Sequence, residues 1–131
     1  MGSIRVSKTN RWHLSIVKSE LRAEAAVCHR EGESMAERYD RLDAKLKAFI
    51  KEQHMYFVGT AGAEGYVNVS PKGMDSFRII DDGNVAWLNL TGSGNETAAH
   101  VMENGRMTIM FCSFDKQPLI MRLYGQATTI H

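Results

Sequence analysis

The stretch of residues 66–106 constrains the fold of this chain more than any other part of the sequence. It reads YVNVSPKGMDSFRIIDDGNVAWLNLTGSGNETAAHVMENGR, so that short apolar runs alternate with groups of turn-forming residues. Runs of this kind, bounded by Gly, Pro, Asn and Asp, are typical of strands joined by tight turns. The strands predicted here are residues 66–70, 76–80 and 85–89. Pro71 is expected to end the first of them, because proline cannot donate to a ladder.

A loop rich in Gly, Ser and Asn follows these strands and opens a short helix, predicted at residues 95–104. Asn95 or Thr91 is the expected N-cap of the helix, and Gly105 is expected to end the helix in the left-handed conformation. Further strands are predicted at residues 54–60, 106–114 and 119–129. Six short strands with one interrupting helix indicate a mainly β fold with flanking helices. Such a fold is an antiparallel barrel or sandwich rather than an alternating parallel sheet.

Ahead of the strands, apolar residues recur at helical spacing over residues 36–53. Leu42, Leu46, Phe49 and Ile50 fall at positions i, i+4, i+7 and i+8, and charged residues occupy the remaining face. We expect this helix to cover one face or one end of the sheet.

Residues 1–34 read differently from the rest, because they are polar and show no clean strand or helix period. Met35 then begins a segment that looks like a native protein start. We therefore interpret residues 1–34 as an N-terminal extension of doubtful role and residues 35–131 as the folded domain. A genuine N-terminal helix that packs on a partner subunit is the alternative. The last predicted strand runs to His131 with no closing element, which predicts an unprotected edge and a chain that is C-terminally incomplete or completed by a partner.

Composition narrows the class of protein. A length of 131 residues predicts one domain, and a formal net charge of +1 gives no reason to expect binding to nucleic acid. We find no apolar run near the ~20 residues that span a bilayer and no signal-peptide core, so we expect no membrane association and a cytoplasmic location. Cys28 and Cys112 show no metal-ligand spacing, so neither a metal site nor a disulfide is expected.

Three segments together resemble the pyridoxamine 5'-phosphate oxidase-like family of FMN-binding split barrels. They are YVNVSPKG at 66–73, VAWLNLTGSGNETAAHVMENGR at 85–106 and LIMRLYGQA at 119–127. The similarity covers about residues 42–131. The resemblance implies a six-stranded antiparallel split β-barrel, a homodimer, and FMN bound at the subunit interface.

The resemblance also implies where the cofactor lies. Residues 67–72 match the strand that runs along the flavin, and Lys72 falls where a basic residue approaches the ring or the phosphate. Residues 87–89 match the next strand beside the ring, and residues 91–97 match the phosphate loop. The implied cofactor-binding residues are Val67, Asn68, Val69, Ser70, Lys72, Trp87, Leu88, Asn89, Ser93, Gly94, Asn95 and Thr97.

The phosphate loop departs from the family pattern. Vitamin B6 oxidases of the family place a Ser-Arg-Lys cluster there, whereas this chain has GSGNET, with Glu96 and Thr97 in place of the basic pair. The helix keeps His100, Glu103 and Asn104, but the family's C-terminal substrate-binding segment is not found in this sequence. Both departures argue against true vitamin B6 oxidase activity.

Without that basic pair we expect phosphate to bind, but more weakly than in the vitamin B6 oxidases. Backbone N–H groups at Ser93, Gly94 and Asn95 lie at a helix N-terminus, where the helix dipole favours an anion. The hydroxyl groups of Ser70, Ser93 and Thr97 can donate hydrogen bonds, and Lys72 or Arg106 can balance the charge. Glu96 opposes binding unless it points to solvent.

The residues and the resemblance together predict an FMN-dependent oxidoreductase of unknown substrate that takes a small molecule, with NADH or NADPH as a candidate electron donor. Lys72 would stabilise the reduced flavin, and no residue stands out as a catalytic acid or base. One alternative is a non-enzymatic carrier of flavin, deazaflavin or haem. Another is an interaction protein whose barrel has lost its cofactor.

Overall fold

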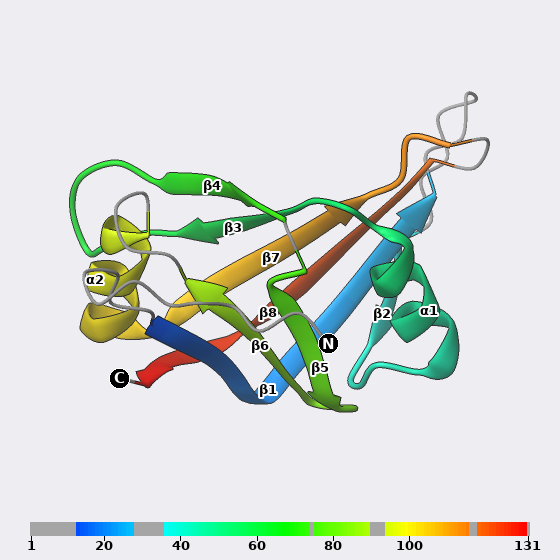
Figure 1. Cartoon of the computed structure of the whole chain (residues 1–131), viewed down its shortest axis with the longest axis horizontal. Helices are drawn as coiled ribbons and strands as arrows, with labels where there is room; N and C mark the ends of the chain where they lie inside the picture. The colour runs from blue at the N-terminus through cyan, green and yellow to red at the C-terminus, as the bar shows by residue number, and fades with distance from the viewer. Residues whose placement is uncertain (1–12, 28–35, 74, 90–93, 116–117, 131) are drawn as a thin grey trace, which may run out of the picture.

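The computed structural model describes residues 13–27, 36–73, 75–89, 94–115 and 118–130. Within these ranges the strands form one antiparallel sheet, and Figure 1 shows a helix at each end of it. The strands are β1 (His13–Val27), β2 (Ala36–Tyr39), β3 (Tyr56–Thr60), β4 (Asn68–Lys72), β5 (Phe77–Asp81), β6 (Asn84–Asn89), β7 (Arg106–Cys112) and β8 (Leu119–Ile130). The helices are α1 (Ala44–Glu52) and α2 (Asn95–Asn104). Across these described ranges, neither helix is long and apolar enough to cross a membrane.

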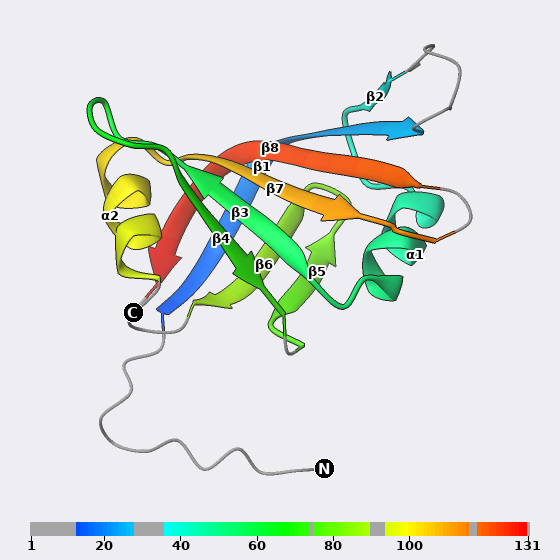
Figure 2. The ribbon, with the colours of Figure 1, turned by 90° about the horizontal axis from the view of Figure 1, so that it is seen from above.

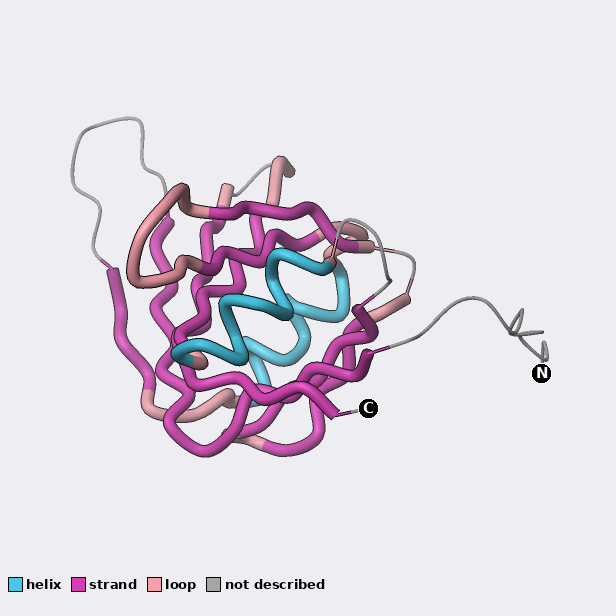
Figure 3. Tube along the Cα trace, turned by 90° about the vertical axis from the view of Figure 1, so that its left-hand side faces the viewer, coloured by secondary structure: helices cyan, strands magenta, loops and turns pink. Residues whose placement is uncertain are grey.

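The sheet curls into an open barrel. Its strand order is β4-β3-β7-β8-β1-β6-β5, and β2 pairs with β1 beside this path. Figure 2 shows the curvature from above, and Figure 3 shows the strands as a curved wall around the helices when seen from the α2 end. Side chains bridge the open side, because the Tyr56 hydroxyl lies 2.7 Å from Ser76 Oγ and the Tyr56 ring packs edge-on against Phe77. The predicted split barrel is confirmed, and all six predicted strands are present.

Strand β1 was not predicted. We expected residues 1–34 to add little to the fold, but β1 pairs with β8, β6 and β2, so that expectation is wrong for the described part of this segment. A register shift between Lys18 and Arg22 interrupts the alternation along the strand. Beyond the shift, Ala23 and Ala25 pair with Leu123 and Met121. Small alanines give little of the hydrophobic alternation by which a strand is recognised.

Strand β8 does not have the unprotected edge that its position at the end of the sequence suggested. It pairs with β7 on one side and with β1 on the other. The predicted edge is therefore wrong, because the missed strand β1 covers it. The strands at the two ends of the described strand order are instead β4 and β5.

Pro71 does not end β4, which continues to Lys72 with Pro71 opposite Phe57. An edge strand tolerates proline when the missing N–H would face away from its neighbour.

Helix α1 is shorter than predicted. Residues 36–39 form β2, and the helix begins only after Asp43, whose carboxylate accepts a hydrogen bond from the N–H of Leu46 at 2.8 Å. Asp43 is thus an N-cap that satisfies one of the free N–H groups of the first turn. Leu42, Leu46 and Ile50 are buried as predicted, and Phe49 packs partly against the same core.

Helix α2 has the predicted bounds, and Gly105 ends it in the left-handed conformation with a φ of 70°. Its buried face carries Thr97 and Val101. The core between the helices is filled from the inner face of the sheet, most fully by Trp87, Ile109, Phe111, Met121 and Leu123.

Candidate functional site

Strand β4 divides the residues that the sequence assigned to the cofactor between two faces. Ser70 is buried, Asn68 and Lys72 are half-buried, and all three share the face that looks into the barrel. Val67 and Val69 lie on the other face, where they are 71% and 62% exposed. The alternation follows from the strand geometry, in which successive side chains point to opposite sides. A polar inner face on a barrel strand indicates a site rather than a packed core.

Asn89 holds the centre of this site. Its side-chain oxygen accepts a hydrogen bond from Lys72 Nζ at 3.0 Å, and its side-chain nitrogen donates to the Gly94 carbonyl at 3.0 Å. Asn89 is only 1% exposed, so its amide is a buried polar group that needs both partners. One residue thereby fixes the Lys72 ammonium, the end of β6 and the start of α2.

A second set of hydrogen bonds ties β4 to α2 directly. Asn68 Nδ2 donates to Thr97 Oγ1 at 2.9 Å and makes a longer contact with Ser70 Oγ at 3.3 Å. Thr97 is fully buried, so its hydroxyl is shielded from water. Asn68, Ser70 and Thr97 therefore form one polar cluster beside the Lys72–Asn89 pair.

The start of α2 offers free N–H groups. Gly94 is the N-cap, and among the described residues no side chain caps the helix, so Asn95, one of the two expected caps, does not do so. Thr91 and Ser93, the other residues assigned to this loop, lie outside the described residues. The first turn of a helix leaves N–H groups without intrahelical partners and carries a partial positive charge. Glu96 in that turn is exposed, so its carboxylate is directed to solvent rather than buried in the site.

Burial lowers the pKa of Lys72 from its usual value, because the partly desolvated ammonium is less stable than in water. Lys72 has a hydrogen-bond acceptor in Asn89 but no carboxylate in ion-pair contact among the described residues. None of the carboxylates in the described ranges therefore neutralises its charge by direct contact. A ligand phosphate or an electron-rich carbonyl would supply the missing partner.

Trp87 and Leu88 occupy different surroundings from Asn89. Trp87 is 1% exposed and belongs to the core, and its indole N–H has no acceptor among the described residues. Leu88 is half-buried, and its backbone N–H donates to the Ser76 carbonyl at 2.8 Å. Of this predicted strand, Asn89 is the residue whose side chain joins the polar site.

The second half of α2 holds the loop between β3 and β4. Glu103 accepts a hydrogen bond from the backbone N–H of Ala63 at 2.7 Å, and Asn104 Nδ2 donates to the Ala61 carbonyl at 2.7 Å. His100 Nδ1 lies 3.0 Å from Thr60 Oγ1. These contacts explain three polar residues of α2 that the sequence singled out without giving them a structural role. They fix the loop that delivers β4 to the site.

An apolar groove of about 350 Å³ lies on the outer face of β3, β4 and β7. Val69 of β4, Val67 just before that strand, and Met110 of β7 line it. The two valines that the sequence assigned to the cofactor thus contribute to the outer surface. Across the described residues, no cluster of three or more His, Cys, Asp or Glu side chains is arranged to hold a metal ion.

Comparison with known proteins identifies the family of this chain. A sequence model of the family described as pyridoxamine 5'-phosphate oxidase matches residues 42–131. The chain belongs to the pyridoxamine 5'-phosphate oxidase family. A curated relative from Aspergillus flavus, the pyridoxamine 5'-phosphate oxidase family protein ustO, is 44% identical over 95 residues, which are 70% of this chain and 38% of the relative. The chain therefore spans well under half the length of that relative. No solved structure matched the chain.

Proposed function

We propose that this chain binds FMN on the inner face of β4, between Lys72, Asn89 and the start of α2, and acts as a flavin-dependent oxidoreductase. The observation that carries the proposal is the Lys72–Asn89–Gly94 series of hydrogen bonds in a member of this family. It joins to one buried amide an ammonium group and a helix N-terminus that, among the described residues, have no carboxylate partner and no side-chain cap respectively. Both features suit a phosphate-bearing planar cofactor.

The residues fit the two ends of such a cofactor. The free N–H groups of the first turn of α2, from Asn95 onward, would hold the phosphate, and the exposed side chain of Glu96 leaves room for it. Lys72 would donate to the polar edge of the ring, and Asn89 would keep the ammonium in place. When bound, FMN supplies the hydride-transfer and electron-transfer chemistry, and the protein supplies binding, orientation and electrostatics.

We further propose that the working form is a homodimer in which a second copy covers the ring. The support is the family resemblance together with the apolar groove on the outer face of the edge strand β4, where Val67 and Val69 are exposed. Exposed apolar side chains beside an unpaired strand edge favour association. A small organic molecule is the proposed substrate, and NADH or NADPH is the proposed electron donor.

Flavin titration of the purified protein tests the proposal. The fluorescence of FMN should be quenched or shifted on binding, with saturation at one equivalent of FMN per chain. Riboflavin, which lacks the phosphate, should bind much more weakly. Lys72→Met should weaken FMN binding by about 1.5–3 kcal/mol, the range for a hydrogen bond to a charged group. Lys45→Met, which alters an exposed lysine of α1, serves as the control.

The outcomes separate the proposed function from its alternatives. Equal affinity for FMN and riboflavin would place the phosphate in solvent and reject the helix N-terminus as its site. Absorption spectra of the loaded protein distinguish FMN from a deazaflavin or a haem. Bleaching of the bound flavin by NADH or NADPH supports an oxidoreductase, whereas a flavin that binds tightly and is never reduced indicates a carrier.

A further inference from the structure

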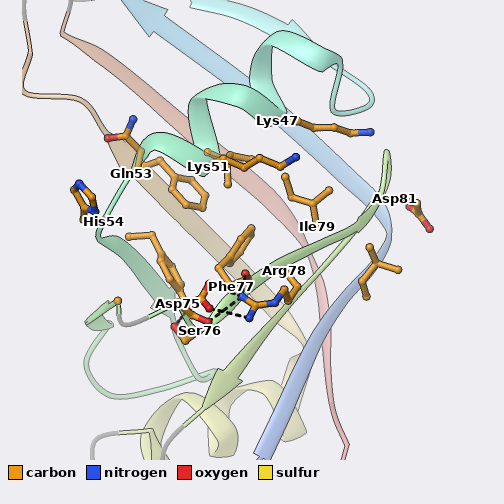
Figure 4. Close-up of a pocket in the computed structure, with 15 residues that line it drawn as sticks. Lys47, Lys51, Gln53, His54, Asp75, Ser76, Phe77, Arg78, Ile79 and Asp81 are labelled. Carbon is orange, nitrogen blue, oxygen red and sulfur yellow. Dashed lines mark hydrogen bonds and ion pairs between the residues drawn. The ribbon is translucent and has the colours of Figure 1, made fainter. Parts of the chain in front are cut away.

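A second cavity opens between α1 and β5, at the other end of the barrel from α2 (Figure 4). It has a volume of about 530 Å³, which lies within the range of small-molecule sites. None of the residues assigned to the flavin lines it. The proposed flavin site therefore does not account for this cavity.

Aromatic and aliphatic side chains form the apolar part of the cavity. The rings of Tyr56, Phe77 and Phe111 contact one another, with centroids 5.1 to 5.5 Å apart. Ile50 of α1 and Ile79 of β5 extend this surface. Edge-to-face and stacked ring contacts make a firm wall against which a planar molecule can pack.

The rim of the cavity carries three cations, Lys47, Lys51 and Arg78, against two carboxylates, Asp75 and Asp81. Two of the cations already have partners, because Lys47 pairs with Asp82 and Arg78 pairs with Asp75. Asp81 is also engaged, since its carboxylate accepts hydrogen bonds from Gly83 and Asn84.

Lys51 is different from the other two cations. Among the residues that the structure describes, it has no carboxylate in ion-pair contact. Figure 4 shows it reaching from α1 toward β5, in the direction of Ile79. The cavity thus combines an apolar wall with one uncommitted positive charge at its mouth.

The cavity is separate from the proposed flavin site. Tyr56 stands directly opposite Lys72 on the paired strands β3 and β4, and its hydroxyl is held by Ser76 at 2.7 Å. The Tyr56 side chain lines the cavity, whereas the Lys72 side chain turns to Asn89. A ligand in the cavity would therefore lie on the α1 side of Tyr56, and the flavin would lie on the α2 side.

We propose that this cavity binds a small molecule with a planar apolar body and a single anionic group, such as an aromatic carboxylate or sulfonate. The body packs against the three rings, and the anion pairs with Lys51 at the mouth. The proposal does not rest on flavin binding.

Two fluorescent probes that differ by one charge test the proposal. 8-Anilinonaphthalene-1-sulfonate carries an aromatic body and a sulfonate, and N-phenyl-1-naphthylamine has the same body without the anion. The sulfonate probe should bind at one equivalent per chain and more tightly than the neutral probe. Lys51→Glu should weaken the sulfonate probe about five- to tenfold and change the neutral probe little, because only the anion contacts the lysine.

Matched variants complete the experiment. Lys45→Glu introduces the same charge change on the same helix at an exposed residue that does not line the cavity, and it should leave both probes unaffected. Ile79→Trp should fill the cavity and weaken both probes, with circular dichroism confirming that the protein is folded.

Three results would overturn the proposal. They are equal effects of the two lysine variants, no binding of the sulfonate probe, and displacement of that probe by FMN. The last would make the cavity part of the flavin site. Failure of FMN to bind at all, with the probe result intact, would reject the proposed function and leave the cavity proposal standing.

Discussion

The ammonium group of Lys72 donates to the side-chain oxygen of Asn89 at 3.0 Å, across the open side of the barrel. Lys72 belongs to β4 at one end of the strand order, and Asn89 belongs to β6 near the other end. Backbone pairing does not join these two strands in the described sheet, so side chains hold them together. The candidate site therefore lies at the open side of the barrel. The hydrogen bond between Lys72 and Asn89 both joins the two sides of that opening and forms part of the site.

Replacing Asn89 should therefore affect both stability and binding. We expect Asn89→Ala to lower the free energy of unfolding by about 1–3 kcal/mol, because a buried amide with two partners is removed. It should also weaken FMN binding, since Lys72 loses its acceptor. Urea denaturation and flavin titration measure the two effects, with Gln126→Ala, which removes an exposed amide outside the site, as control. An unchanged free energy of unfolding would show that the Asn89 contacts contribute nothing net.

Glu96→Lys should lower the stability of α2 and at the same time strengthen phosphate binding. Glu96 lies in the first turn of α2, where its carboxylate suits the helix dipole, so its reversal should cost about 0.3–1 kcal/mol of stability. The same change should tighten FMN binding, because a like charge is replaced by a cation near the phosphate. Riboflavin affinity should stay constant. Glu52→Lys on the distant helix α1 controls for net charge, and an equal gain in that variant would mean that the effect is not local.

Tyr56 should make stability fall at high pH. Burial raises the pKa of Tyr56 to about 12, from 10.0 for an unperturbed tyrosine. Between these two values the unfolded chain ionises Tyr56 while the folded chain keeps it neutral. The free energy of unfolding should therefore decline by up to ~1.4 kcal/mol per pH unit from this group as the pH rises through that window.

The comparison with Tyr56→Phe isolates this contribution. That variant should lose less stability between pH 10 and 12 than the unmodified protein, when urea denaturation is repeated across the window. Tyr66→Phe is the matched control, because Tyr66 is 90% exposed. Parallel pH profiles for the unmodified protein and Tyr56→Phe would contradict the assigned pKa.

Gly105→Ala should destabilise the end of α2. Gly105 has a φ of 70°, which costs an L-residue about 1–2 kcal/mol. A Cβ there would also lie 2.6 Å from Gln126 Oε1 and 3.3 Å from the Ala127 carbonyl. Thermal unfolding should show the loss, whereas Gly83→Ala should cost less, because its Cβ would meet no atom nearer than 3.8 Å. Equal costs for the two variants would argue against backbone strain at Gly105.

The sequence was most informative where apolar residues form short runs between turn residues or recur at helical spacing. Strands β3 and β6–β8 and the burial of Leu42, Leu46 and Ile50 follow directly from such patterns. It was least informative where packing with distant strands decides the structure. Nothing local marks Ala23 and Ala25 as strand residues, because their partners Leu123 and Met121 lie far along the chain. Residues 36–39 likewise join β1 as β2 instead of extending α1.

The candidate site shows the same limit. Lys72, Asn89 and Gly94 were named from the family pattern, but their mutual hydrogen bonds depend on how β4, β6 and α2 meet in space. Sequence spacing also could not tell that Val67 and Val69 face outward while Asn68 and Ser70 face inward, because that depends on which face of β4 is covered. The cavity between α1 and β5 had no signal in the sequence, since its rings come from three separate strands.

The position of β1 in the sheet has a consequence for how the chain reaches its folded state. Ala23 pairs with Leu123, one hundred residues later, so a long loop must close before β1 and β8 can join. Pairings of this kind slow folding. On the ribosome, β1 emerges well before β8, and one of its edges stays open until β8 has been made. Of the described strands, β8 is thus made after both of its neighbours, β7 and β1, and it pairs between them.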